Sequence, residues 1–159
     1  MATFTAQIEI QAPASVVFEW HHQPSALEWL IPPWAPVTVL WRQGSIHNDD
    51  ETCLQLRPLA PIFPWLTIHW LARHEQYTSS DACYSFCDRQ IRGPFATWLH
   101  RHSVIPLDKD HCQLVDTITY TLPLHGLSEP IIGFWVRQEL ARMFAYRQRV
   151  TRQQCEKLV

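Results

Sequence analysis

Glycine is scarce in this sequence, with only four glycines among 159 residues. Gly44, Gly93, Gly126 and Gly133 are too widely spaced for a glycine-rich loop that cradles phosphate groups, so the common nucleotide-binding motifs are absent. The sequence also lacks a Gly-x-Ser-x-Gly nucleophile elbow and a recognisable cysteine-protease segment. We therefore do not expect a hydrolase that works through a catalytic triad.

The sequence has no excess of positive charge and no long apolar run. Its net charge is −2 with the nine histidines counted as neutral, which disfavours nucleic acid as a partner. It contains no stretch of ~18 apolar residues that would predict a transmembrane segment, and no leader pattern at its start. The five cysteines are odd in number and show no C-x-x-C spacing, so they indicate neither a disulfide framework nor a zinc site. We expect a reduced, cytoplasmic protein that folds as one domain over residues 1–159.

Apolar and polar residues alternate along much of the chain, which is typical of half-buried strands. This alternation predicts strands over residues 3–11, 37–43, 50–58, 65–77, 82–90, 95–106 and 111–122. The residues predicted to face inward all have even numbers: Leu54, Leu56, Ile68, Trp70, Ala72, Tyr84, Phe86, Trp98, Ile118 and Tyr120. Because the phase is constant, we expect one curved, antiparallel, seven-stranded sheet.

Three segments have helical rather than strand periodicity. A helix is predicted after Pro13, and a second short helix is predicted at Ala26–Leu30, following Pro24. The tail from Leu127 to about Cys155 is predicted to be one long helix. Its apolar stripe comprises Ile131, Ile132, Trp135, Val136, Leu140, Met143, Phe144 and Val150. We expect this stripe to cover the inward face of the sheet, which gives an α+β architecture.

Several segments carry a resemblance to a known superfamily. They are the Ala-Pro start of the first helix at 12–21, residues 30–34, residues 90–95 with their Gly-Pro-Phe turn together with Trp98, His100 and His102, residues 116–120 with Pro123, and residues 142–147 with their Met-Phe-Ala-Tyr-Arg segment. In these segments and in its order of elements, the chain resembles the SRPBCC superfamily of START-like, helix-grip proteins. That superfamily includes lipid-transfer START domains, pollen allergens and polyketide cyclases.

More narrowly, the chain resembles the branch of that superfamily that occurs alone or ahead of an epimerase-like domain. Because no epimerase domain follows Val159, we expect the stand-alone form, without a dinucleotide site or other cofactor. The resemblance implies a cavity between the sheet and the long helix. Such a cavity would accept an apolar small molecule, for example a lipid, a polyketide or an isoprenoid, but the resemblance implies no particular reaction.

The strand predicted at 95–106 has an unusual inward face, since Trp98, His100 and His102 all point to the same side. Two titratable rings beside a tryptophan are unlike the aliphatic surface of an ordinary sheet core. Two histidine nitrogens on one face of a strand could bind a metal ion. No third ligand is identifiable, so we expect no metal site.

A short hairpin would place His102 beside Asp116. If Leu107 lies opposite His111, then His102 lies opposite Asp116, with their Cβ atoms about 4.5–5.5 Å apart. The pair is either a buried polar pair that stiffens the sheet or a dyad in which Asp116 orients His102 as a general base. Asp88 shares the inward phase and extends this polar patch.

Three functions are compatible with these patterns, and we favour binding over catalysis. The first is a small-molecule-binding protein with a cavity of about 300 Å³ or more. Its expected lining is Leu54, Leu56, Trp70, Phe86, Asp88, Trp98, His100, Ile118, Tyr120, Trp135 and Phe144, with His102 and Asp116 at the polar end.

The second function is a cyclase, aromatase or dehydratase. Here His102, oriented by Asp116, would abstract a proton next to a carbonyl, while Tyr120 or His100 donates to the developing oxyanion. This requires His102 to be accessible from a pocket.

The third function is an interaction or regulatory module. The contact with a protein partner or a second copy of the chain would be made by an apolar rim or by the basic face of the tail helix between Arg137 and Lys157. The rim would comprise Trp29, Trp34 and Trp65.

Overall fold

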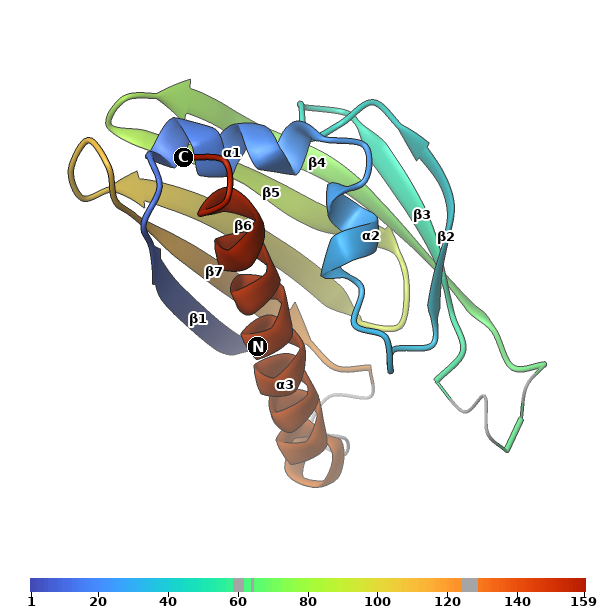
Figure 1. The fold of residues 1–159 in the computed structure, drawn as a ribbon. Helices are drawn as coiled ribbons and strands as arrows, with labels where there is room; N and C mark the ends of the chain where they lie inside the picture. The colour runs from blue at the N-terminus through green and yellow to red at the C-terminus, as the bar shows by residue number, and fades with distance from the viewer. Residues whose placement is uncertain (59–61, 64, 124–128) are drawn as a thin grey trace.

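The structure is a computed structural model that describes residues 1–58, 62, 63, 65–123 and 129–159, and the side chains of all of these except 129–131. Its elements, in chain order, are β1 (Ala2–Ile10), α1 (Ala14–His22), α2 (Ala26–Leu30), β2 (Val37–Gln43), β3 (Glu51–Leu56), β4 (Ile68–Ser80), β5 (Cys83–Arg92), β6 (Thr97–Pro106), β7 (Cys112–Thr121) and α3 (Glu129–Cys155) (Figure 1). Every predicted strand is therefore present, and so are the two short helices and the long helix. Leu127, where the sequence predicts the long helix to begin, lies outside the described residues.

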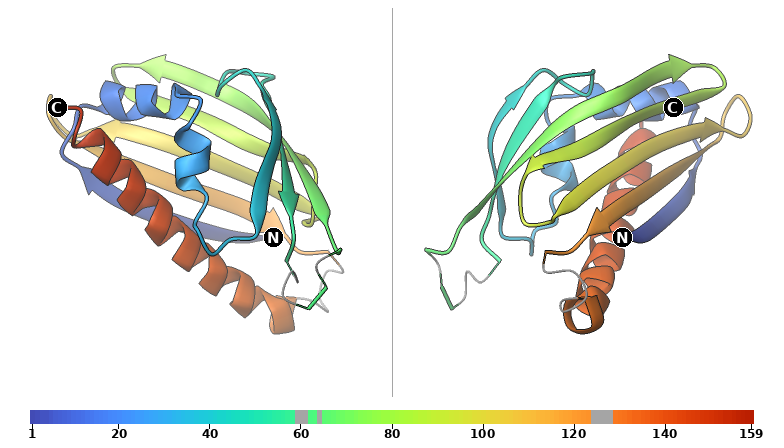
Figure 2. Two further views of the ribbon diagram at one scale, coloured as in Figure 1. Left: turned by 45° about the vertical axis from the view of Figure 1, so that its right-hand side comes forward. Right: turned by 180° about the vertical axis from the view of Figure 1, so that it is seen from behind.

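The seven strands form one antiparallel sheet in the order β1-β7-β6-β5-β4-β3-β2. The sheet is curved, and all three helices lie on its concave face (Figure 2). The predicted inward phase is confirmed, because Trp98 and Ile118 are 6% and 0% exposed. None of the helices in the described residues is long and apolar enough to cross a membrane.

A side-chain clamp shapes the turn between β5 and β6. The amide of Gln90 donates from Nε2 to the carbonyl of Phe95 at 2.8 Å, and its Oε1 accepts from the Phe95 backbone N–H at 3.4 Å. A Cβ atom at Gly93 would meet the Gln90 side chain, which explains the glycine in this turn. Gln90 therefore fixes the start of β6.

The long helix α3 packs on the β1 and β7 end of the sheet. Leu140 and Phe144 of α3 are buried against Phe4, Ile118 and Tyr120. Direct packing of large side chains leaves this side of the concave face filled. Near the C-terminal end of α3, Val150 of the apolar stripe is also buried, in a second apolar cluster that includes residues of α1.

The predicted burial of the first turns of α3 is wrong. Trp135 is 70% exposed and Ile132 is 48% exposed. A helix of 27 residues is about 40 Å long, which exceeds the length of the 9- and 10-residue strands beneath it. The N-terminal end of α3 consequently projects beyond the sheet (Figures 1 and 2).

Candidate functional site

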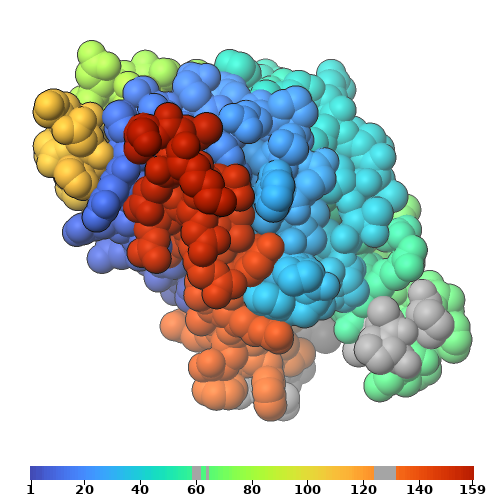
Figure 3. All heavy atoms as spheres, viewed as in Figure 1, coloured from blue at the N-terminus to red at the C-terminus, as the bar shows by residue number. Residues whose placement is uncertain are grey.

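A cavity of about 170 Å³ lies on the concave face of the sheet, under α2 and the chain that connects α2 to β2. The predicted lining residues that border it are Leu54, Leu56, Trp70, Phe86, Asp88, Trp98 and His100, together with His102. Ala26, Leu27 and Leu30 of α2 form part of the opposite wall, and α3 contributes Met143 and Arg147. The space-filling view shows α2 and α3 side by side over this face (Figure 3).

Four predicted lining residues lie elsewhere. Ile118, Tyr120 and Phe144 belong to the packed core under α3, and Trp135 is exposed at the projecting end of that helix. The cavity therefore lies mainly between the sheet and α2, not between the sheet and the long helix as expected. Tyr120, which was expected to donate to an oxyanion, is 1% exposed and does not border the cavity.

The cavity is smaller than the expected size of about 300 Å³ or more. Aromatic side chains occupy one end of it. The ring of Trp98 lies 4.9 Å from that of Trp70 and 4.8 Å from that of Phe95, between ring centroids. These rings reduce the open volume to the size of a compact molecule.

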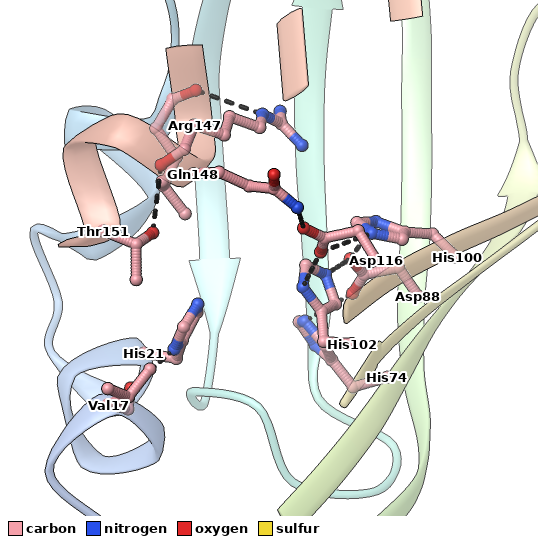
Figure 4. Close-up of polar contacts among 11 residues, drawn as sticks. Val17, His21, His74, Asp88, His100, His102, Asp116, Arg147, Gln148 and Thr151 are labelled. Atoms are coloured by element: carbon pink, nitrogen blue, oxygen red, sulfur yellow. Dashed lines mark hydrogen bonds and ion pairs between the residues drawn. The ribbon is translucent and has the colours of Figure 1, made fainter. Parts of the chain in front are cut away.

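Five ionisable residues gather at one end of the cavity, and we name them the polar cluster: His74, Asp88, His100, His102 and Asp116. They come from four adjacent strands, β4 to β7, whose registers place His74 opposite Asp88, Asp88 opposite His100, and His102 opposite Asp116. The last of these pairings confirms the register expected from the short hairpin. Figure 4 shows the five side chains converging.

Asp116 accepts hydrogen bonds on both carboxylate oxygens. Its Oδ1 lies 3.1 Å from Nε2 of His100 and 3.0 Å from Nδ1 of His102. Its Oδ2 accepts from Nε2 of Gln148, which reaches down from α3, at 3.0 Å (Figure 4). The predicted contact between His102 and Asp116 is present, but it is one part of a larger network.

Asp88 lies on the other side of the same histidines. Its Oδ2 is 3.1 Å from Nε2 of His102 and 3.6 Å from Nδ1 of His100, and its Oδ1 is 2.8 Å from Nε2 of His74. Both ring nitrogens of His102 therefore face carboxylates.

The charges of the polar cluster follow from these contacts. Burial alone would raise the pKa of Asp116, but hydrogen bonds from His100 and His102 outweigh burial and hold the pKa well below its usual value. The pKa of Asp88 is also lowered, because the charge of His74 and the histidine hydrogen bonds outweigh burial. For His102, burial is outweighed by hydrogen bonds to both carboxylates, which raise its pKa to about 9.

These contacts do not favour His102 as a general base. A base needs a free lone pair within reach of the substrate proton. With one nitrogen on Asp116 and the other on Asp88, and with a raised pKa, His102 is a buried cation between two carboxylates. The geometry of His102 and Asp116 therefore fits a buried polar pair better than a dyad in which His102 is the general base.

Two further residues at the cavity were not identified from the sequence. Nδ1 of His21 on α1 lies 2.8 Å from the carbonyl oxygen of Val17, so Nδ1 carries the proton and Nε2 keeps its lone pair. His21 borders the cavity, and burial together with the charge of His102 lowers its pKa to about 4. Arg147 on α3 is held by a hydrogen bond from its Nε to the carbonyl of Leu30, at 3.1 Å.

No strong sequence signal marks His21 or Arg147. His21 lies at a buried helical position, and Arg147 lies within the Met-Phe-Ala-Tyr-Arg segment. Their approach to the polar cluster depends on how α1 and α3 rotate against the sheet. Periodicity does not fix that rotation closely enough.

Asp88, His100 and His102 are the residues in the described part of the chain that could hold a metal ion. One ligand atom from each lies within 4.8 Å of the others. Asp88 is the third candidate ligand of this group, and its inward phase on the strand beside His100 and His102 is the sequence signal that could have indicated it.

The comparisons with known proteins agree with the fold. The model of the family described as polyketide cyclase / dehydrase and lipid transport matches residues 10–145. The chain therefore belongs to this family, which confirms the resemblance to the SRPBCC superfamily. No curated protein matches the chain.

Solved structures with the same fold have low sequence identity to the chain. The Zhui aromatase/cyclase of Streptomyces sp. R1128 has a TM-score of 0.68 at 17% identity, covering 98% of this chain and 94% of that one. A START superfamily protein of Mycobacterium smegmatis has a TM-score of 0.67 at 15% identity, covering 99% of both chains. A nucleoside-diphosphate sugar epimerase of Corynebacterium glutamicum has a TM-score of 0.65 at 23% identity, covering 94% of this chain and 28% of that one. These likenesses establish a START-like fold.

Proposed function

We propose that the protein binds a compact, largely apolar molecule that carries an oxygen-bearing group at one end. The observation that supports this most directly is the arrangement of the cavity. Leu54, Leu56, Trp70 and Trp98 form an apolar wall, and the polar cluster closes one end through the members that border the cavity, His74, Asp88, His100 and His102. Ligand sites commonly combine such walls with a few placed polar groups.

The size of the cavity narrows the class of ligand. An apolar cavity of about 150 Å³ in another protein holds one benzene molecule. The cavity here, at about 170 Å³, fits a single ring with a short substituent. A long acyl chain or a multi-ring polyketide would need the aromatic side chains of Trp70 and Trp98 to move.

The wall also contains an unsatisfied donor. Arg42 borders the cavity, and its Nε is a buried atom without a hydrogen-bond partner among the described residues. Leaving a buried donor unpaired is unfavourable, so a ligand oxygen that accepts from Arg42 would relieve this cost. Arg147 supplies a second positively charged group at the wall. We therefore favour a ligand with a hydroxyl, carbonyl or carboxylate group.

Calorimetric titration with p-cresol tests the proposal, because this molecule has one ring, one methyl group and one hydroxyl group. We expect saturable binding by the wild type. The variant Ala72→Phe places a ring in the cavity and should abolish binding, while Ala141→Phe places the same ring on an exposed part of α3 and should bind like the wild type. No binding by the wild type, or equal binding by both variants, would contradict the proposal.

A cyclase or dehydrase reaction is the second candidate, and one observation favours it. His21 offers a lone pair on Nε2 at the cavity, since its Nδ1–H donates to Val17. In this role His21, rather than His102, would remove a proton next to a carbonyl. The Tyr120 hydroxyl is not available for the oxyanion, but Arg147 borders the same cavity.

Deuterium exchange of cyclohexanone in heavy water, followed by NMR, tests this candidate. This single-ring ketone has exchangeable protons beside its carbonyl. Catalysed exchange that is lost in His21→Asn, while p-cresol still binds, would support a proton-abstracting role. Exchange no faster than in buffer, or exchange unchanged in His21→Asn, would reject it.

A further inference from the structure

We propose that Asp88, His100 and His102 bind one divalent transition-metal ion at the polar end of the cavity. The three residues lie on adjacent strands, β5 and β6, and border the cavity. One ligand atom from each lies within 4.8 Å of the others. This inference does not depend on the proposed function, because metal binding is measured without an organic ligand.

Each of the two histidines directs one ring nitrogen at Asp116 and the other at the proposed metal position. Nε2 of His100 and Nδ1 of His102 both lie at hydrogen-bond distance from Oδ1 of Asp116, at 3.1 and 3.0 Å. Asp116 thus fixes a proton on each of these nitrogens and leaves Nδ1 of His100 and Nε2 of His102 for an ion. Metal-binding histidines usually donate their second N–H to a carboxylate or carbonyl in this way.

The carboxylates are also held in place. Oδ1 of Asp88 lies 2.8 Å from Nε2 of His74. The other nitrogen of this ring, Nδ1, lies 3.2 Å from the backbone oxygen of Asp50. This leaves Oδ2 of Asp88 directed at the two histidine nitrogens that do not face Asp116, Nδ1 of His100 and Nε2 of His102. Gln148 similarly holds Oδ2 of Asp116 at 3.0 Å. Each ligand therefore has a partner that orients it.

Two spacings between ligand atoms, both from Oδ2 of Asp88, lie at or within a few tenths of an ångström of those around a coordinated ion. Bonds of about 2.0–2.1 Å place neighbouring ligand atoms of one ion about 3.0–3.4 Å apart. Oδ2 of Asp88 is 3.1 Å from Nε2 of His102 and 3.6 Å from Nδ1 of His100. An ion would replace the proton that otherwise lies between Asp88 and His102, which means that binding releases a proton.

The ligand set indicates the class of metal. Two imidazoles and one carboxylate are typical of Fe²⁺, Zn²⁺ and related first-row ions, and three protein ligands leave further coordination positions open. Because the three ligands border the cavity, an open position would face any bound molecule. The negative charges of Asp88 and Asp116 would offset the charge of the ion.

Titration of the untagged, chelator-stripped protein with Zn²⁺ by calorimetry, and with Co²⁺ by visible absorption, tests the proposal. We expect one ion per chain. Binding should be lost in Asp88→Asn and His100→Gln, and should weaken about 10–100-fold in Asp116→Asn, because that change removes the orienting carboxylate. Circular dichroism shows whether each variant folds.

The matched control is His111→Gln, which removes an exposed histidine whose Nδ1 lies 2.9 Å from Asp108. This variant should bind as tightly as the wild type. X-ray absorption of the zinc-loaded wild type gives a result even if a variant does not fold, and should show two imidazole ligands. No bound ion at one equivalent, equal binding by His100→Gln and His111→Gln, or a site without imidazoles would overturn the proposal.

Discussion

Replacing Asp116 by asparagine tests the energetic role of the polar cluster. The carboxylate of Asp116 accepts three hydrogen bonds at 3.0–3.1 Å, and its side chain is 4% exposed. Asparagine is neutral, so all three bonds lose their charged acceptor, and the amide nitrogen that replaces one oxygen cannot accept a hydrogen bond. We expect the free energy of unfolding to fall by about 3–5 kcal/mol, the usual loss when one partner of a buried ion pair is removed.

Urea denaturation followed by circular dichroism measures this loss, with a chelator present so that no bound metal contributes. In a chain of this length each kcal/mol lowers Tm by roughly 2–4 °C, so Tm should fall by roughly 6–20 °C. The control is Asp108→Asn, at a carboxylate that is 57% exposed and also contacts a histidine. This exposed pair should contribute less than about 1 kcal/mol. Equal, small losses in both variants would refute the reasoning.

Two further predictions concern α3 and the thiols. Phe144→Ala should cost about 3–5 kcal/mol because Phe144 is 1% exposed, whereas Trp135→Ala, at 70% exposure, should change stability by less than about 0.5 kcal/mol in the same assay. Comparable losses would contradict the placement of α3. With a thiol reagent at pH 8, Cys83 should react first, because it is partly exposed while the other four cysteines are buried. Cys155 should stay unreactive until the protein unfolds, because burial raises its pKa to about 12. Fast labelling of Cys155 would contradict this prediction and show that the end of α3 opens.

Much of the fold could be predicted because strand alternation leaves few choices. Trp98 and Ile118 have even numbers in separate strands, and a sheet with one buried face must place both on that face. The short connection after β6 likewise left one register that sets His102 opposite Asp116. Local pattern and short-range geometry were sufficient for these features.

The exposed end of α3, the residues that reach the polar cluster from the helices and the volume of the cavity could not be predicted, because they depend on packing between elements. Trp135 follows the periodicity of the apolar stripe, but periodicity does not show that the helix extends past the sheet. Gln148 and His21 reach the polar cluster only through the rotation of α3 and α1 against the strands. The volume of the cavity depends on how Trp70 and Trp98 pack against each other, which the sequence does not specify.

The indole N–H signals in an NMR spectrum, recorded during a titration with p-cresol, test the central claim most directly. The claim is that the concave face holds a small ligand between an apolar wall and the polar cluster. Trp70 and Trp98 border the cavity, whereas Trp135 is exposed outside it. We expect saturable shifts of the signals of Trp70 and Trp98, with that of Trp135 unchanged. Unchanged signals for the two cavity tryptophans, or shifts confined to Trp135, would contradict it.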